Sequence, residues 1–298
     1  MRTQTGMADH PVNEPLLGYA PGSPERAALQ DELDRQMADC PDIPCIINGE
    51  KVYTGNVVHE VIPHKHGHII AGVHQAGKKE IAAACQAAID AQEAWINMGL
   101  EARCAIFERC AELLAGDWRM KVNASTMLNQ SKTAFQAEID SACELIDFWN
   151  FNCHYAREFH EQYQPLVSPP GVKNSTEIRP LEGFVLAITP FNFSSIAANL
   201  PSAPAILGNT AVWKPSRNSY HSNYVLMELM MEAGLPAGVI NFVPSSGPDI
   251  SDVCLSNPDF AGVHFTGSTA VFQGLWQRIG EALPNLKSYP RIVGETGG

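Results

Sequence analysis

The feature that most constrains the fold is an alternation of short apolar runs and amphipathic segments over residues 183–298. The apolar runs predict strands, and in chain order they read FVLAIT, TAVWKP, VINFVP, GVHFTG and RIVGE. The segments between them predict helices, and they read SSIAANLPSAPAILG, SNYVLMELMMEAG, DISDVCLSN and TAVFQGLWQRIGEAL. Apolar strands that alternate with helices are typical of a parallel sheet covered on both faces. We therefore expect an α/β fold with a Rossmann-like parallel sheet.

Three further segments precede this region. Residues 1–45 are rich in Pro and Gly and then weakly helical, which predicts an arm packed on the body. Residues 46–162 predict short strands, with turns at Asn48-Gly49 and Gly67, and then a helical layer. The expected helices span residues 78–96, 101–116 and 133–161. Residues 163–182 resemble two strands joined by a Pro-Gly turn and polar on both faces, so we expect a protruding hairpin.

Charge and composition favour small-molecule chemistry. The formal net charge is -12, and no run of lysine or arginine occurs, which argues against binding to nucleic acid or a membrane surface. No apolar run is long enough for a transmembrane helix. The first residues lack the pattern of a signal or transit peptide. We expect a cytoplasmic protein, or a mitochondrial matrix protein if the source is eukaryotic.

The cysteines and histidines predict no metal site. The 8 cysteines form no CxxC pair, and most fall at apolar helical positions, as expected of reduced core thiols. His64, His66 and His68 alternate, which is compatible with a metal site or with a half-exposed strand. The strand is favoured, because no carboxylate or cysteine accompanies the histidines in the pattern.

Polar and small residues follow the predicted strands directly. They are Thr189-Pro190-Phe191-Asn192-Phe193, Lys214-Pro215-Ser216, Gly247-Pro248, Thr266-Gly267-Ser268-Thr269 and Glu295. The carboxyl ends of parallel strands meet at one edge, where ligands bind, so these loops are expected to line one crevice.

A dinucleotide is one ligand that this crevice fits. Lys214 would lie near a ribose, and Ser268 would open a helix whose backbone N–H groups face a pyrophosphate. No GxGxxG fingerprint occurs, so the site would be an unconventional one. Taken alone, Gly267-Ser268-Thr269 is better explained as a helix cap.

Glu144 is a second candidate site residue, in the predicted helix over 133–161. It shares a helical stripe with Phe148, Phe151 and Tyr155, where burial of a carboxylate without a partner is costly. The stripe leaves two interpretations open, a pocket carboxylate or a glutamate that reaches solvent past Phe148.

Together and in this order, the loops resemble the aldehyde dehydrogenase superfamily through PFN, WKPS, FTGST and GETGG. Longer stretches narrow the resemblance to its Δ1-pyrroline-5-carboxylate dehydrogenases, the L-glutamate γ-semialdehyde dehydrogenases. These stretches are YAPGSPERAALQ, QAEIDSACELIDFWNFN, the run from LVSPPGVKN to VWKPS, and PRIVGETGG. The resemblance runs from about residue 14 to the last residue.

The resemblance implies roles for individual residues. Asn192 would stabilise an oxyanion, Glu295 would be the general base, and Glu144 and Phe193 would line the substrate pocket. The implied cofactor contacts are Thr189, Phe191, Lys214, Ser216, Gly247, Gly267, Ser268, Thr269, Ala270 and Val271. NAD is the implied cofactor. Many relatives carry a glutamate three residues after the cofactor lysine, whereas this chain has Arg217, which would also tolerate the 2′-phosphate of NADP as a secondary cofactor.

In that family a cysteine beyond the glutamate attacks the aldehyde, a hydride passes to NAD, and the thioester is hydrolysed. The sequence ends before that cysteine, so we expect about half of an enzyme, with the catalytic domain absent. Cys254 is the only cysteine within the predicted sheet region. Its expected place in a helix away from the crevice argues against a substitute nucleophile.

The resulting hypothesis is NAD-dependent oxidation of L-glutamate γ-semialdehyde to L-glutamate, the second step of proline catabolism, by a homo-oligomer assembled through residues 163–182. Two alternatives stay open. One is a dehydrogenase for another aldehyde, since the residues that anchor the amino-acid end are expected outside this chain. The other is a naturally short, non-catalytic protein that binds a dinucleotide or a full-length partner.

Overall fold

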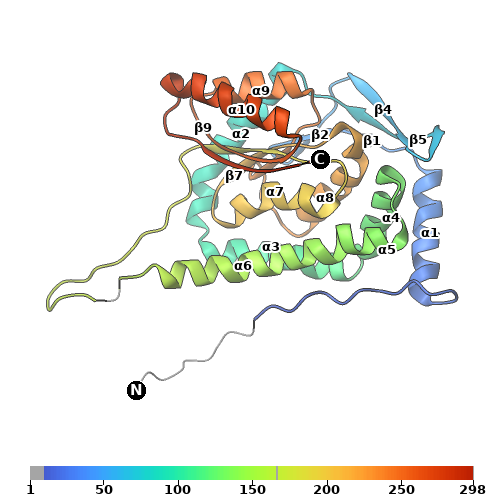
Figure 1. Cartoon of the computed structure of the whole chain (residues 1–298), viewed down its shortest axis with the longest axis horizontal. Helices are drawn as coiled ribbons and strands as arrows, with labels where there is room; N and C mark the ends of the chain where they lie inside the picture. The colour runs from blue at the N-terminus through green and yellow to red at the C-terminus, as the bar shows by residue number, and fades with distance from the viewer. Residues whose placement is uncertain (1–9, 166, 298) are drawn as a thin grey trace.

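The computed structural model describes residues 10–165 and 167–297, in which helices cover both faces of a central sheet (Figure 1). The helices are α1 (Pro24–Ala38), α2 (Lys78–Asn97), α3 (Leu100–Ala115), α4 (Arg119–Gln130), α5 (Ala134–Ala137), α6 (Glu144–Gln162), α7 (Ser194–Ile206), α8 (Tyr220–Glu232), α9 (Gly247–Ser256) and α10 (Thr269–Ala282). A π-helical segment, η1 (Glu138–Cys143), joins α5 to α6, and η2 (Arg217–Ser219) and η3 (Leu283–Asn285) are short 3-10 helices. The strands are β1 (Asp42–Ile43), β2 (Cys45–Ile47), β3 (Glu50–Val52), β4 (Val57–Ile62), β5 (Lys65–His74), β6 (Phe184–Ile188), β7 (Thr210–Lys214), β8 (Ile240–Phe242), β9 (Phe260–Gly267) and β10 (Arg291–Thr296).

The central sheet has the strand order β10-β9-β6-β7-β8-β2-β3. Its first five strands are parallel, which confirms the expected parallel sheet, whereas β2 and β3 join antiparallel. From β6 the chain moves one way to β7 and β8, and then returns to place β9 on the other side of β6. The sheet therefore has its topological switch point between β6 and β9, where ligands bind in open α/β sheets.

The strands alternate their side chains between two cores. Phe184 and Leu186 of β6 pack into one core with Ile81 of α2. Ala187 and Trp213 point the other way, into the core formed with helices α3, α6, α7 and α8. Since both faces are buried, these strands must be apolar along their whole length.

A smaller sheet of order β1-β5-β4 lies beside the central one. It supports α8, because Glu60 of β4 accepts hydrogen bonds from the backbone N–H groups of Tyr220 and His221 at 2.9 and 2.8 Å. His66 and His68 lie in β5, as the strand interpretation expects, and His64 lies in the turn before it. The turn expected at Gly67 is wrong. It falls at Pro63 and His64, and Gly67 continues the strand.

The segment 163–182 projects from the body as a long loop, below and to the left in Figure 1. A turn with the hydrogen bond from Val172 N to Pro169 O confirms the Pro-Gly turn. The two expected strands are wrong, because the described residues of this segment contain no strand. Gln164 and Thr176 still contact each other across its base. Among the residues that the structure describes, neither limb pairs with a sheet.

Two further findings concern the helices. The helix expected over 133–161 is interrupted by η1, directly before Glu144. Among the described residues, no helix combines the length and the apolar character that a membrane span requires.

Candidate active site

The loops after β6 and β9 flank the switch point, and hydrogen bonds fix the first of them. Thr189 is buried, accepts a hydrogen bond from Trp213 Nε1 at 3.0 Å, and donates its backbone N–H to Lys214 O at 3.2 Å. Asn192 and Phe191 follow it and are exposed. The sheet thus holds the base of this loop and leaves the amide of Asn192 open to a ligand.

Phe193 is the N-cap residue of helix α7, and Lys132 lies over its ring. The Lys132 Nζ atom is 4.0 Å from the ring centroid, within the range of a cation–π contact. The same ammonium group pairs with Asp140 of η1. Lys132 therefore connects the loop after β6 to the helix that carries Glu144.

Glu144 is half-buried and accepts a hydrogen bond from Ser195 Oγ in the first turn of α7. Burial raises the pKa of Glu144, and the negative charges of Asp140 and Glu295 raise it further, while Ser195 and Lys132 act in the opposite direction. Glu144 therefore lies within electrostatic reach of Glu295 and is held in place by Ser195.

Glu295 lies on β10, at the edge of the sheet, in register with Thr266 of β9. Ile188, the last residue of β6, is in register with the adjacent Phe265. Since neighbouring strands are about 4.8 Å apart, Glu295 and the start of the Asn192 loop are separated by roughly 10 Å. The glycine before Glu295 is required by packing, because a Cβ atom at Gly294 would overlap the ring of Phe272.

Lys214 and two helix N-termini form the expected cofactor side of the site. Lys214 ends β7, and burial lowers its pKa to about 8. Ser246 and Ser268 are the N-caps of α9 and α10, and their hydroxyl groups accept from Asp249 N and Val271 N. Ser268 therefore caps α10, as expected if the Gly267-Ser268-Thr269 turn is a helix cap. A cap leaves other first-turn N–H groups free for an anionic ligand, so it does not exclude the dinucleotide.

The remaining candidate cofactor residues surround these groups. Gly247 opens α9 and has no atom within 4 Å of the position a Cβ would take, so a ligand has room there. At Gly267 a Cβ would lie 2.8 Å from the Phe265 ring, which explains the glycine. Ser216 is the N-cap of η2. Thr269, Ala270 and Val271 are exposed in the first turn of α10.

Arg217 lies in η2 and is exposed. With Phe191 and the buried Glu60 it lines a cavity of about 380 Å³ between the β4–β5 hairpin and the end of α4. The guanidinium group therefore lies next to the loops that carry Lys214 and Asn192.

Seven of the 8 cysteines are buried. Cys254 is fully buried in α9 with its Sγ atom 3.7 Å from Cys85 Sγ, and burial raises its thiol pKa well above the ordinary value. Cys40 is the exposed cysteine of the chain, and it follows α1. A buried protonated thiol is a poor nucleophile.

Sequence patterns missed Lys132, Asp140 and Ser195. The spacing of four residues between Asp140 and Glu144 was a visible signal, since it places two acids on one helical face. Lys132 has no such signal, because it lies in a loop and reaches the site only through the packing of α4 against η1.

Comparisons with known proteins agree with this geometry. The family model described as the aldehyde dehydrogenase family matches residues 53–298. The Δ1-pyrroline-5-carboxylate dehydrogenase of Agaricus bisporus is 47% identical over 287 residues, which cover 96% of this chain and 52% of that protein. The human mitochondrial Δ1-pyrroline-5-carboxylate dehydrogenase is 43% identical, over 96% of this chain and 51% of that protein.

The fold is also similar to that of a solved structure. The crystal structure of Δ-pyrroline-5-carboxylate dehydrogenase from Mycobacterium tuberculosis matches with a TM-score of 0.94 at 49% identity, over 100% of this chain and 55% of that one. A further crystal structure of that enzyme has NAD bound. The chain spans about half the length of the curated relatives it matches. The chain belongs to the aldehyde dehydrogenase family and is similar to the amino-terminal portion of its Δ1-pyrroline-5-carboxylate dehydrogenases.

Proposed function

We propose that this chain forms the cofactor-binding half of an NAD-dependent dehydrogenase that oxidises L-glutamate γ-semialdehyde to L-glutamate, the second step of proline catabolism. The observation that carries the proposal is the placement of the Asn192 loop, Glu144 and Glu295 around one switch point. By the complete enzyme we mean a polypeptide that carries these residues together with the remaining half of the relatives' length.

The proposed roles follow from the chemistry of the side chains. The Asn192 amide donates to the aldehyde oxygen as negative charge develops on it, and one such donor typically lowers the barrier by about 3 kcal/mol. A cysteine outside this chain supplies the nucleophile, since the cysteines here are buried thiols except Cys40, which follows α1. Glu295 takes a proton from the water that attacks the resulting thioester.

NAD supplies a hydride acceptor when it is bound, and the residues present fit a dinucleotide. The half-buried ammonium group of Lys214 has no ion pair among the described residues, so its charge is available to a ligand near the ribose. The first turns of α9 and α10 open toward the same side and would hold the pyrophosphate. Arg217 follows Lys214 by three residues and would also tolerate a 2′-phosphate, so NADP is a secondary cofactor in this proposal.

The substrate assignment is tested by comparing aldehydes with the complete enzyme. With NAD, we expect kcat/KM for L-glutamate γ-semialdehyde to exceed that for propanal by about 100-fold, because polar groups that recognise a substrate discriminate strongly against an analogue without them. NADH formation is the measurement, and NADP at equal concentration is the cofactor control. A preference for propanal would contradict the substrate, and no oxidation of either aldehyde would contradict the function.

We also propose that residues 163–182 mediate contact between subunits. The segment projects from the body, and Val167 and Val172 are 75% and 54% exposed, so the loop has no core of its own.

A deletion tests this role. Replacing residues 165–177 of the complete enzyme with a short Gly-Ser linker is expected to lower its mass in light scattering. The anchor at Leu181, whose backbone contacts Gln92 and Asn209, is retained, so that the body stays folded. An unchanged mass, with thermal unfolding also unchanged, would rule out this interface.

A further inference from the structure

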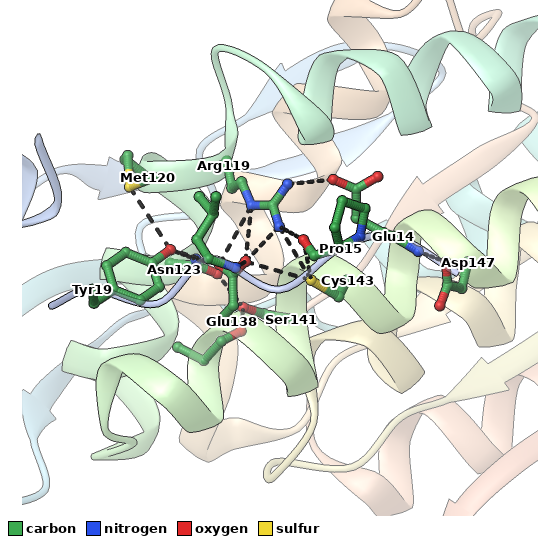
Figure 2. Close-up of polar contacts among 12 residues, drawn as sticks. Glu14, Pro15, Tyr19, Arg119, Met120, Asn123, Glu138, Ser141, Cys143 and Asp147 are labelled. Atoms are coloured by element: carbon green, nitrogen blue, oxygen red, sulfur yellow. Dashed lines mark hydrogen bonds and ion pairs between the residues drawn. The ribbon is translucent and has the colours of Figure 1, made fainter. Parts of the chain in front are cut away.

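A buried network of charges lies outside the site, where the N-terminal arm crosses α4 and η1 (Figure 2). Its centre is the ion pair between Arg119 of α4 and Glu138 of η1, whose side chains are 5% and 0% exposed. Arg119 also pairs with Glu14 and donates to Pro15 O at 2.8 Å, so it joins the arm to the pair.

The Glu138 carboxylate is fully engaged. It accepts from Tyr19 Oη at 2.6 Å, Asn123 Nδ2 at 2.7 Å and the backbone N–H of Leu17 at 2.8 Å. Burial alone would raise its pKa, but Arg119, Tyr19 and the backbone N–H of Leu17 lower the pKa below its ordinary value. Removal of one partner of such a pair is strongly destabilising, because a buried charge is left uncompensated. The network is therefore a rigid anchor for the start of η1.

The segment anchored in this way is π-helical. Its last turn closes with a hydrogen bond from Glu144 N to Ile139 O, five residues back. A π turn holds one residue more than an α turn, so conversion to α-helix would rotate Glu144 by roughly 100° relative to Glu138. π turns are rare, and those inside α-helices are frequently found at functional sites. Since an α turn is the common alternative, we expect this π turn to depend on the tertiary contacts of Glu138.

The two faces of η1 connect the network to the site. On one face, Glu138 meets Arg119, and Ser141 Oγ donates to Asn123 Oδ1 at 2.9 Å. On the other face, Asp140 pairs with Lys132, and the next residue after η1 is Glu144, which meets Ser195. The arm and the candidate substrate pocket thus contact opposite sides of one short segment.

We propose that Arg119 and Glu138 are positioning residues for the substrate pocket. With arm residues 13–19 they hold η1 in the register that sets Glu144 against Ser195 and beside the Lys132–Asp140 pair. This inference rests on the proposed role of Glu144 in the pocket.

A double-mutant cycle in the complete enzyme tests the inference. Glu138→Gln is expected to lower kcat/KM for the aldehyde about tenfold when Glu144 is present, and less than about twofold in a Glu144→Gln background. The KM for NAD should not change. A residue that only stabilises the fold would give equal losses in both backgrounds, and that result would overturn the proposal.

Two further variants provide a control for the cycle and a milder substitution. Glu108→Gln is the matched control, because Glu108 of α3 pairs with Arg157, which lies roughly 20 Å along α6 from Glu144. It should show no coupling to Glu144. If Glu138→Gln fails to fold, Tyr19→Phe removes one donor to Glu138 and keeps the ion pair, and it should couple to Glu144 in the same direction.

A second readout does not depend on activity. In residues 1–298 labelled with ¹³C at the glutamate carboxyl, the Glu144 resonance is followed against pH. Glu138→Gln should lower the pKa of Glu144, because a displaced side chain loses its burial, and Glu108→Gln should leave the pKa unchanged. If Glu144→Gln left kcat/KM unaltered, its pocket role would fail, and this titration would decide the positioning. An unchanged pKa of Glu144 in the Glu138→Gln variant would then overturn the positioning proposal.

Discussion

Glu295→Gln in the complete enzyme is expected to produce a burst of NADH followed by turnover at least about 100-fold slower than that of the unaltered enzyme. Hydride transfer from the covalent adduct does not need a base for water, whereas hydrolysis of the thioester does. A positioned general base typically contributes ~10²–10⁴-fold, and the loss should fall on the hydrolytic step alone. The measurement is rapid-mixing absorbance of NADH, with a burst close to one equivalent per site.

The matched control is Glu281→Gln, an exposed glutamate at the end of α10 whose carboxylate contacts Gln277. That variant should retain both phases. If Glu295→Gln slowed the burst and the steady state by the same factor, Glu295 would act on adduct formation or hydride transfer, and its assignment as hydrolytic base would be wrong.

The strands of the central parallel sheet, and the loops that meet at its carboxyl edge, could be predicted from the sequence. The reason is that these strands are buried on both faces. Phe184, Leu186 and Ala187 all have to be apolar, since alternate residues enter different cores. Once the sheet is parallel, its carboxyl ends must share an edge. The loops with Asn192 and Lys214 and the strand end at Glu295 follow from that rule.

The π-helical segment could not be predicted in the same way. The apolar stripe through Ile146, Trp149 and Cys153 fits one continuous helix, and nothing in its spacing reveals the extra residue per turn. The turn depends on Arg119 and Tyr19, which are 19 and 119 residues from Glu138 in the sequence. Long-range ion pairs of this kind leave no local periodicity.

Two predictions from the sequence were wrong for local reasons, namely the turn at Gly67 and the strands in segment 163–182. A glycine such as Gly67 is a turn signal, but it is also tolerated inside a strand near a β-bulge, and register shifts do occur at Val61 in the paired strand. In segment 163–182 two limbs that are polar on both faces flank a Pro-Gly turn, which suggests a hairpin, yet the limbs find no neighbouring edge among the described residues. A strand needs a partner, which sequence alone does not supply.

The chain by itself, residues 1–298, is expected to show no measurable oxidation of aldehydes. Without covalent capture, the carbonyl is neither activated for hydride loss nor held against the cofactor. Loss of orientation alone can forfeit about 7 kcal/mol or more, which corresponds to a rate factor of about 10⁵. Weak dinucleotide binding should persist, since Lys214 and the first turns of α9 and α10 are present.

The most direct test of the central claim uses purified residues 1–298 with L-glutamate γ-semialdehyde and NAD. NADH absorbance reports turnover, and calorimetry with NAD alone reports binding. The account predicts cofactor binding without NADH above the background, because the cofactor site lies in this chain and the nucleophile does not. Sustained NADH formation that Cys254→Ala abolishes, while Cys40→Ala leaves it intact, would contradict the account by showing that the chain carries its own nucleophile.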